Sequence, residues 1–578
     1  MGFLLRFIGL SKFPYGFTPD EASFGYDAYS LYSTGKDQWG HPWPLVLESF
    51  GDFKAPLYSY LAIPFIWVFG ISKFAIRLPN ALLGTAAIYV VFLLTSQFMK
   101  EFKLEIGNWK LEIITAALLA ISPWHVMMSR GAFEANLTTF FLPLGIYLFL
   151  KGIQNTESTK HTGSGIQLKS INKDHSPGVK KRNKYLLLSA LIFGLNLFSY
   201  HSAKLVTPLV VGSLLILYRN QLKFITMKAR IYSSILFLIF LLLGAYSFKL
   251  GAGTRAKDIS IFANAQVEAA GDRLTAIEAG APFTLAKLTH NKFQLAIRKF
   301  VSNYLTYFSP NFLLFQGPSE TTYGMIPGRG VIYWFEAVLL LGFILYLAKR
   351  KIAKEVKLVV IWLLAAPIPA ALSTGPGYAA NRAVIMLPAV QIILAIGAFT
   401  IYTYYEILLK KIYFKFAVRM FFIISLIFFL SFIEDYFILS PKKTAQGMLW
   451  GNYEAIEWVS QNASEKSNVL VSRSLSEPHI YYAFVSEYNP HNYQKESESW
   501  NYSDMGLSWV DQLPTYKLGN FYFESIDEDK LKNKAFEYVV GYPQEFPENT
   551  IPEKSFKYPD GNNSVYVVKS TSQVYAAK

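Results

Sequence analysis

An acidic pair, Asp20-Glu21, directly follows Thr18-Pro19 near the start of the chain. The periodic stretch Ala22–Tyr32 comes next, so one interpretation is a helix N-terminus whose dipole favours two carboxylates. The other interpretation is catalytic, because a carboxylate just beyond an apolar segment can act as a general base at a membrane surface. The two interpretations are compatible, and the sequence leaves both open.

A lysine, Lys54, lies in the segment Gly51–Tyr60, and an apolar, aromatic run continues from there to Phe69. Such a run can lie in the plane of the membrane interface. Lys54 then has two possible roles: its ammonium snorkels to water, or it holds a lipid phosphate as a point charge.

Arg130 and Glu134 are four residues apart, which on a helix is one turn and favours a simple ion pair. Both are expected at a membrane boundary, where charge is costly and usually has a function. Three more cations are expected on the same side: Lys204, Arg329 and Arg382. The positive-inside rule disfavours cations there, so together they indicate an anionic ligand.

The elements that must position these residues are strongly apolar. The chain has 578 residues, no cysteine, 52% hydrophobic and 16% charged residues, whereas soluble domains carry about 25% charged residues. This composition excludes a single soluble core and intrinsic disorder, and the missing cysteines exclude a disulfide scaffold or a cysteine-ligated zinc site. Ten apolar runs predict membrane helices, at 78–98, 111–124, 137–150, 185–199, 205–217, 231–248, 331–348, 358–372, 383–403 and 417–433.

The charge of the connecting segments predicts the orientation of the chain. Five basic segments alternate with the others and are expected to face the cytoplasm: 99–110, 151–184, 218–230, 349–357 and 404–419. The long segments 11–77 and 249–330 and everything after about residue 434 then lie on the outer side. Alternation also requires a span before Ser11, so Gly2–Leu10, which Arg6 interrupts, is expected to be the end of a first span whose beginning is missing.

The net charge of +15 does not indicate a nucleic-acid partner. From Glu434 onward the chain has 13 Lys/Arg and 20 Asp/Glu, a net charge of −7, so the first 433 residues carry +22. That excess lies in short loops between apolar runs, where it sets orientation in a bilayer.

The last quarter of the chain has a different pattern. A polar helical stretch, Tyr453–Gln461, is followed by β-rich runs at Asn468–Ser472, Tyr538–Gly541 and Ser564–Val568, with turn signals between them. The sequence therefore predicts a mainly α protein: a polytopic transmembrane helix bundle over 1–433 and a small extracytoplasmic α/β domain over 434–578.

The order of several motifs carries a family resemblance. The motifs are Asp20-Glu21, Gly25–Tyr29, Asp52–Tyr58, Phe74–Gly84 and Ser122–Glu134. Together they resemble the GT-C membrane glycosyltransferases, and most of all the prokaryotic relatives of protein O-mannosyltransferases and of the lipid A aminoarabinose transferase. The resemblance covers nearly the whole chain and implies a polyprenyl-phosphate sugar donor.

The resemblance also implies roles for individual residues. Asp20 matches the acid that acts on the acceptor, Glu21 its neighbour, and Glu134 a second acidic position. Lys54 matches the lysine that contacts the lipid phosphate. The other donor-phosphate candidates come from their expected placement alone: Arg130, Lys204, Arg329 and Arg382. No cofactor or metal is expected, although related oligosaccharyltransferases hold a divalent cation with carboxylates like these.

The function expected from these residues is inverting glycosyl transfer at the outer face of the cytoplasmic (inner) membrane. A carboxylate removes the acceptor proton, and a cation stabilises the departing phosphate. The expected partners are a polyprenyl-phosphate-sugar, an acceptor that is a lipid, protein or glycan, and the membrane lipids, with no nucleic acid. The alternatives are a polytopic transporter of a sugar or lipid-linked substrate, which would need intramembrane charges or broken helices, and a structural membrane protein.

Overall fold

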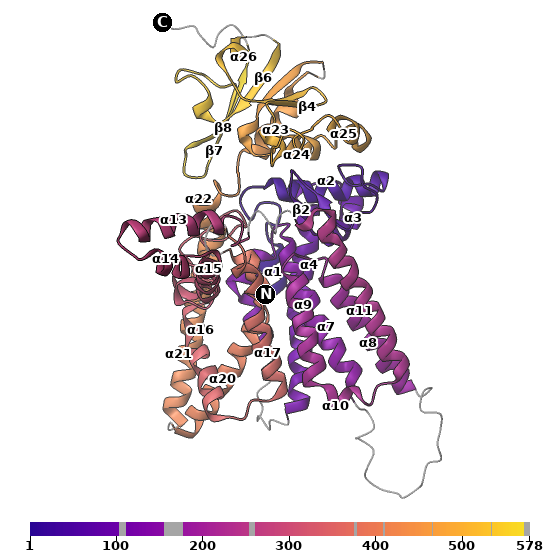
Figure 1. The fold of residues 1–578 in the computed structure, drawn as a ribbon, viewed down its shortest axis with the longest axis vertical. Helices are drawn as coiled ribbons and strands as arrows, with labels where there is room; N and C mark the ends of the chain where they lie inside the picture. Colours follow the sequence, from indigo (N-terminus) through magenta and orange to yellow (C-terminus); the bar gives the residue numbers. More distant parts are fainter. Residues whose placement is uncertain are drawn as a thin grey trace, which may run out of the picture.

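The fold is a helix bundle that carries a separate β-sheet at one end (Figure 1). The computed structural model describes residues 1–102, 111–154, 177–253, 260–374, 379–408, 411–464, 466–532 and 535–570. Parts of three basic segments expected in the cytoplasm, 99–110, 151–184 and 404–419, lie outside the described residues.

Each of the ten apolar runs coincides with helix in the structure, because a long run of apolar residues can satisfy its backbone in lipid only as a helix. The helices of the bundle are α1 (Gly2–Phe7), α4 (Lys73–Phe102), α5 (Leu111–Ile121), α6 (Pro123–Met128), η1 (Glu134–Leu137), α7 (Thr138–Ile153), α8 (Pro177–Asn196), α9 (Ala203–Leu217), α10 (Arg219–Leu222), α11 (Met227–Ser247), α16 (Trp334–Lys349), α17 (Lys354–Ala365), α18 (Ile368–Ala371), α19 (Ala380–Ala383), η6 (Val384–Met386), α20 (Ala389–Leu408) and α21 (Lys411–Glu434).

Several of these helices can cross a membrane. Within the described residues, four helical segments are long and apolar enough, Lys73–Met99, Glu134–Ile153, Met227–Gly251 and Ile412–Thr444, or five if the bent pair Ala380–Met386 and Ala389–Tyr404 is one span. The segments Leu111–Ile121 and Ala203–Leu217 are apolar but shorter. The protein is therefore a multi-pass membrane protein.

The two long segments expected on the outer side are both folded. Residues 11–77 contain α2 (Pro19–Thr34), the short antiparallel pair β1 (Leu47–Glu48) and β2 (Phe53–Lys54), and α3 (Leu57–Phe69). The described part of 249–330 contains η4 (Phe248–Ala252), α13 (Ala265–Glu278), α14 (Phe283–Thr289), α15 (Lys292–Thr306) and η5 (Asn311–Phe315). Figure 1 shows α2, β2 and α13 at the end of the bundle that faces the sheet, and α10 at the opposite end.

The sheet has six strands in the order β4-β5-β3-β6-β8-β7. The central strand β3 (Asn468–Ser472) is parallel to β5 (Phe521–Glu524) and β6 (Phe536–Gly541), and the other pairs are antiparallel. The remaining strands are β4 (Thr515–Leu518), β7 (Lys554–Lys557) and β8 (Asn563–Lys569). The β-rich runs and the helical stretch predicted from the sequence are confirmed as β3, β6, β8 and α23 (Asn452–Asn462).

Short helices complete this part of the chain and join it to the bundle. They are η7 (Asp435–Leu439), α22 (Ser440–Thr444), η8 (Arg473–Leu475), α24 (Pro478–Val485), α25 (Pro490–Ser497), η9 (Val510–Gln512), α26 (Glu528–Lys532) and η10 (Pro543–Glu545). Helix α24 packs on α2, the Tyr481 hydroxyl donates to the Phe17 carbonyl at 2.8 Å, and Lys73 pairs with Glu454 at 2.7 Å. The sheet part therefore rests directly on the segment that contains Asp20.

Candidate active site

Helix α2 positions the acidic pair, and its start follows from local sequence. The Thr18 hydroxyl accepts a hydrogen bond from the Glu21 amide at 3.3 Å, and the Glu21 carboxylate accepts one from the Thr18 amide at 3.4 Å. This capping box, with Pro19 in the first turn, satisfies amides that a helix start leaves unpaired. The predicted helix N-terminus at Asp20-Glu21 is confirmed.

Asp20 and Lys54 form an ion pair at the end of the bundle that faces the sheet. The Lys54 ammonium lies 2.8 Å from the Asp20 carboxylate, and the side chains are 4% and 46% exposed, respectively. The ammonium also lies 4.8 Å from the centre of the Phe24 ring and 5.0 Å from that of Phe50. A buried cation between two aromatic faces is poorly hydrated, so it binds an anion more strongly than an exposed lysine does.

Glu21 has a different environment from its neighbour. Its carboxylate is fully buried and accepts hydrogen bonds from Arg77 Nε and Nη2 at 2.8 and 2.9 Å and from the Ala132 amide at 2.9 Å. Arg77 also donates to the Gly16 carbonyl at 2.7 Å. With both oxygens occupied, Glu21 ties α2 to α4 and is not available to a substrate or metal; among the described residues, no group of three potential ligands could hold a metal.

Tyr323, in the second long segment, is influenced by three acidic residues from different parts of the chain. Burial raises the pKa of Tyr323 well above its usual value, and the negative charges of Asp20, Glu134 and Glu320 raise it further. In a poorly solvated site such an effect acts over longer distances than in water, and it weakens as the separation grows. The charges of Asp20 in α2, Glu134 in η1 and Glu320 in the 316–333 segment therefore act on one phenol. The Tyr323 ring meets that of Phe133, the residue before Glu134, edge to face at 5.4 Å.

Arg382 is linked to these residues through Glu320. Its guanidinium donates to the Ser373 hydroxyl at 2.9 Å and to the Thr374 carbonyl at 2.8 Å. Burial raises the pKa of Glu320 to about 7, and the positive charge of Arg382 opposes this shift. The charge of Arg382 thus acts on Glu320, which in turn acts on Tyr323.

The sheet part contributes a further carboxylate, that of Glu477, the residue immediately before α24. Burial raises the pKa of Glu477 well above its usual value; the Asp511 and Asp20 carboxylates add to this effect and the Lys54 ammonium opposes it. Its Oε2 lies 3.7 Å from His479 Nδ1, and the His479 ring meets Phe50 edge to face at 5.6 Å. Phe50 therefore lies between the Lys54 ammonium and the sheet part.

Two of the predicted phosphate-binding cations are held by other groups. Arg130 is fully buried and donates to the carbonyls of Leu5 and Ile8, both at 2.5 Å. Lys204 donates to the Ser247 hydroxyl at 2.8 Å. The expected helical turn between Arg130 and Glu134 is wrong, because α6 ends at Met128 and η1 begins only at Glu134.

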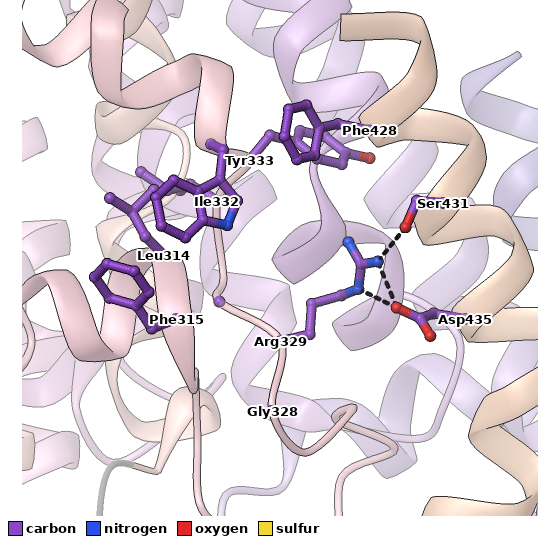
Figure 2. A pocket seen from close by; sticks show the side chains of 11 residues that line it. Leu314, Phe315, Gly328, Arg329, Ile332, Tyr333, Phe428, Ser431 and Asp435 are labelled. Atoms are coloured by element: carbon purple, nitrogen blue, oxygen red, sulfur yellow. Dashed lines mark hydrogen bonds and ion pairs between the residues drawn. The ribbon is translucent and has the colours of Figure 1, made fainter. Parts of the chain in front are cut away.

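Arg329 lies in a separate pocket, which Figure 2 shows. Its Nε donates to the Asp435 carboxylate at 2.7 Å, and its Nη2 donates to the Ser431 hydroxyl at 2.9 Å. Both partners belong to α21 and η7. The structure thus joins Asp20 to Lys54, links Glu134 and Arg382 to the neighbouring Tyr323 and Glu320 by their charges, and places Arg130 and Arg329 elsewhere.

Sequence reasoning named no role for Tyr323, Glu320 or Arg77. Tyr323 and Glu320 lie in the long segment 249–330, whose length indicated function without indicating which residue. Arg77 is part of the family-like motif Phe74–Gly84, but nothing in that motif indicates a partner 56 residues away.

Comparison with known proteins supports the fold. No protein-family model matches the chain, and no curated protein sequence matches it. The structure is similar to ArnT from Cupriavidus metallidurans in the apo state, with a TM-score of 0.50 and 11% identity over 100% of this chain and 97% of that chain.

Two other solved structures have slightly lower scores. ArnT from the same organism bound to undecaprenyl phosphate has a TM-score of 0.49 at 10% identity, over 100% of this chain and 98% of that chain. The Archaeoglobus fulgidus oligosaccharyltransferase in complex with Zn and sulfate has a TM-score of 0.47 at 14% identity, over 98% and 72%. The likeness to apo ArnT, together with the apolar helices, shows that this chain has the fold of the GT-C membrane glycosyltransferases.

Proposed function

We propose that the protein is an inverting glycosyltransferase that moves a sugar from a polyprenyl-phosphate donor to an acceptor at the outer face of the cytoplasmic membrane. The observation that carries this proposal is the pair of a half-exposed carboxylate, Asp20, and a buried ammonium, Lys54, at 2.8 Å. One is a base and the other is an anion ligand, and they lie in one site of a protein with a GT-C fold.

The two groups supply the two needs of the reaction. The acceptor hydroxyl oxygen attacks the anomeric carbon, the bond from that carbon to the phosphate oxygen breaks, and the hydroxyl proton moves to Asp20. Positive charge develops at the anomeric carbon and negative charge on the leaving phosphate, which Lys54 stabilises. A single in-line displacement inverts the anomeric centre.

The ion pair also couples donor binding to base activation. While Lys54 holds Asp20, the ammonium occupies the carboxylate at 2.8 Å. A donor phosphate that takes Lys54 relieves that interaction and leaves Asp20 available to the acceptor. Glu134, Glu320, Tyr323 and Arg382 then form the polar wall of the site, and Glu21 is a positioning residue that acts through Arg77.

Mass spectrometry of cell-envelope glycans, with and without the gene, tests the proposal. Loss of one sugar from one envelope component on deletion, and its return with the wild-type gene, is the expected result and identifies both sugar and acceptor. An unchanged set of envelope glycans, with the substrate instead accumulating in vesicles that contain the protein, would support the transporter alternative.

A further inference from the structure

The pocket around Arg329 lies away from the Asp20–Lys54 site. Its volume is about 210 Å³, and its walls come from η5, the 328–333 segment, the start of α16 and the end of α21. Figure 1 shows α16 and α21 together on one side of the bundle, with β2, which carries Lys54, towards the other side. The pocket is therefore separate from the Asp20–Lys54 site.

Specific backbone contacts hold the walls of the pocket in place. Gly317 has a φ of +66°, and a Cβ there would lie 2.0 Å from the Arg329 carbonyl oxygen. Ile332 donates its amide to the Leu313 carbonyl at 3.0 Å, which ties the segment carrying Arg329 to η5. The guanidinium is thus held in place from its backbone as well as by Asp435 and Ser431.

Hydrogen-bond donors without partners face this space. Arg329 uses Nε and Nη2 on Asp435 and Ser431, and among the described residues its Nη1 has no acceptor; Figure 2 shows the guanidinium directed towards α21. The Ser431 hydroxyl accepts from Arg329 and donates to no described residue. The indole N–H of Trp334, whose side chain is 46% exposed, also has no acceptor among the described residues. Three donors open to one pocket call for a ligand rich in acceptors.

The charge of the pocket points to an anion. Asp435 pairs with two cations, because its second oxygen lies 3.6 Å from Nζ of Lys443, a residue just outside the pocket lining. One carboxylate against two cations leaves a charge of +1. A phosphate oxygen is an acceptor only and matches both the charge and the donors.

The walls of the pocket continue into surfaces that face lipid. Phe315 and Trp334 meet edge to face at 4.6 Å, and both are about half exposed. Below them, α16 exposes Val338 and Leu341, and α21 exposes Leu430 and Ile427. These rows would accommodate acyl chains, and Trp at their upper end is typical of a membrane interface.

We propose that this pocket binds the phosphate of an anionic bilayer phospholipid, in the leaflet on the side of the β-sheet. Arg329 Nη1 and Ser431 contact the phosphate, the charge of Lys443 beside the pocket favours the anion, and the acyl chains lie along α16 and α21. The ligand is a structural lipid and not the sugar donor, since the pocket contains no base that could act on an acceptor: its one carboxylate is held by Arg329.

Native mass spectrometry of the purified full-length protein tests this proposal, with dioleoylphosphatidylglycerol as the probe. We expect a bound phosphatidylglycerol, and about tenfold weaker binding in Arg329→Gln, since a hydrogen bond to a charged group is worth about 1.5–3 kcal/mol. Arg298→Gln is the matched control, because Arg298 is 69% exposed on α15. Dioleoylglycerol, which has the chains and no phosphate, is expected not to bind here.

The double variant Arg329→Gln/Asp435→Asn covers the case in which Arg329→Gln does not fold, because it leaves no unpaired carboxylate. Lys443→Gln, at a half-exposed residue, is a third variant and should also weaken binding. Wild-type affinity in the double variant, or equal binding of dioleoylglycerol, would overturn the proposal. Displacement of phosphatidylglycerol from this pocket by an equimolar amount of undecaprenyl phosphate would overturn the distinction between structural lipid and donor.

Discussion

At the scale of single residues, the central contrast is between Asp20 and Glu21. The sequence presents them as equivalent neighbours, and both fit a helix N-terminus. The structure leaves Asp20 half exposed beside Lys54 and encloses Glu21 against Arg77. Sequence alone could predict a carboxylate and a lysine on the same side, but it could not predict which carboxylate stays open, because Arg77 is distant in the chain.

Lys54→Gln tests the phosphate role of the buried ammonium. The variant keeps a polar side chain and removes the charge, so we expect the KM for a polyprenyl-phosphate-sugar donor to rise about tenfold or more with a smaller effect on folding. Lys36→Gln, at an exposed lysine just after α2, is the control and should behave like the wild type. An unchanged donor KM and kcat in Lys54→Gln would refute phosphate binding by this residue.

Glu320 makes the stability depend on pH. Its pKa rises from 4.5 to about 7 because it is buried, so the folded state favours the neutral form. Stability from this group is full below about pH 4.5 and is lost as the pH rises towards 7. We expect the Tm of the wild type to fall over this range and that of Glu320→Gln to fall less; parallel curves would show that the carboxylate has no such burial cost.

At the scale of elements, the apolar runs predicted the helices well, because a lipid-facing backbone has few alternatives. The predicted turn joining Arg130 to Glu134 failed for a local reason. The Ser129 amide closes the last turn of α6 on His125, and Arg130 turns to the carbonyls at the end of α1 and just after it. A spacing of four residues indicates a shared helical face only where the helix continues.

The buried pair of Glu21 and Arg77 fixes α2 to α4. Removing one partner of a buried, hydrogen-bonded ion pair leaves the other charge uncompensated and costs about 3–5 kcal/mol. We therefore expect Glu21→Gln to lower the Tm markedly in a detergent melt. Asp20→Asn, one residue away and half exposed, removes the carboxylate from the buried Lys54 ammonium but leaves that ammonium over the Phe24 and Phe50 rings, so we expect a smaller loss of Tm. Equal losses in the two variants would contradict the assignment of distinct roles.

At the scale of the whole molecule, the site joins segments that are far apart in the chain. Asp20, Lys54, Glu134, Glu320 and Arg382 come from the bundle and its outer segments, and Glu477 comes from the sheet part. The charge pattern predicted that the outer segments share one side of the membrane. It could not predict that the sheet part covers the Asp20–Lys54 pair, because such docking depends on complementary surfaces rather than on composition.

The backbone of the sheet part approaches the segment 11–77 closely enough to exclude a side chain at Gly51. Its φ is +118°, and a Cβ there would lie 2.0 Å from the Ser508 carbonyl oxygen. We expect Gly51→Ala to separate the two parts, which limited proteolysis would detect as faster cleavage between them, and to reduce transfer. Gly212→Ala on α9, where nothing lies within 4 Å of the added carbon, is the control. Wild-type protease resistance in Gly51→Ala would show that the contact is not needed.

The most direct test of the account is complementation of a strain that lacks the gene, followed by mass spectrometry of its envelope glycans. Wild-type protein should restore the missing sugar. Asp20→Asn, present in the membrane at the wild-type level and folded at the assay temperature, should lower transfer by about 10²–10⁴-fold, since a positioned general base contributes that much. Asp504→Asn, a change at an exposed residue of the sheet part, should restore the sugar fully. Full restoration by Asp20→Asn would contradict the proposal that this carboxylate deprotonates the acceptor.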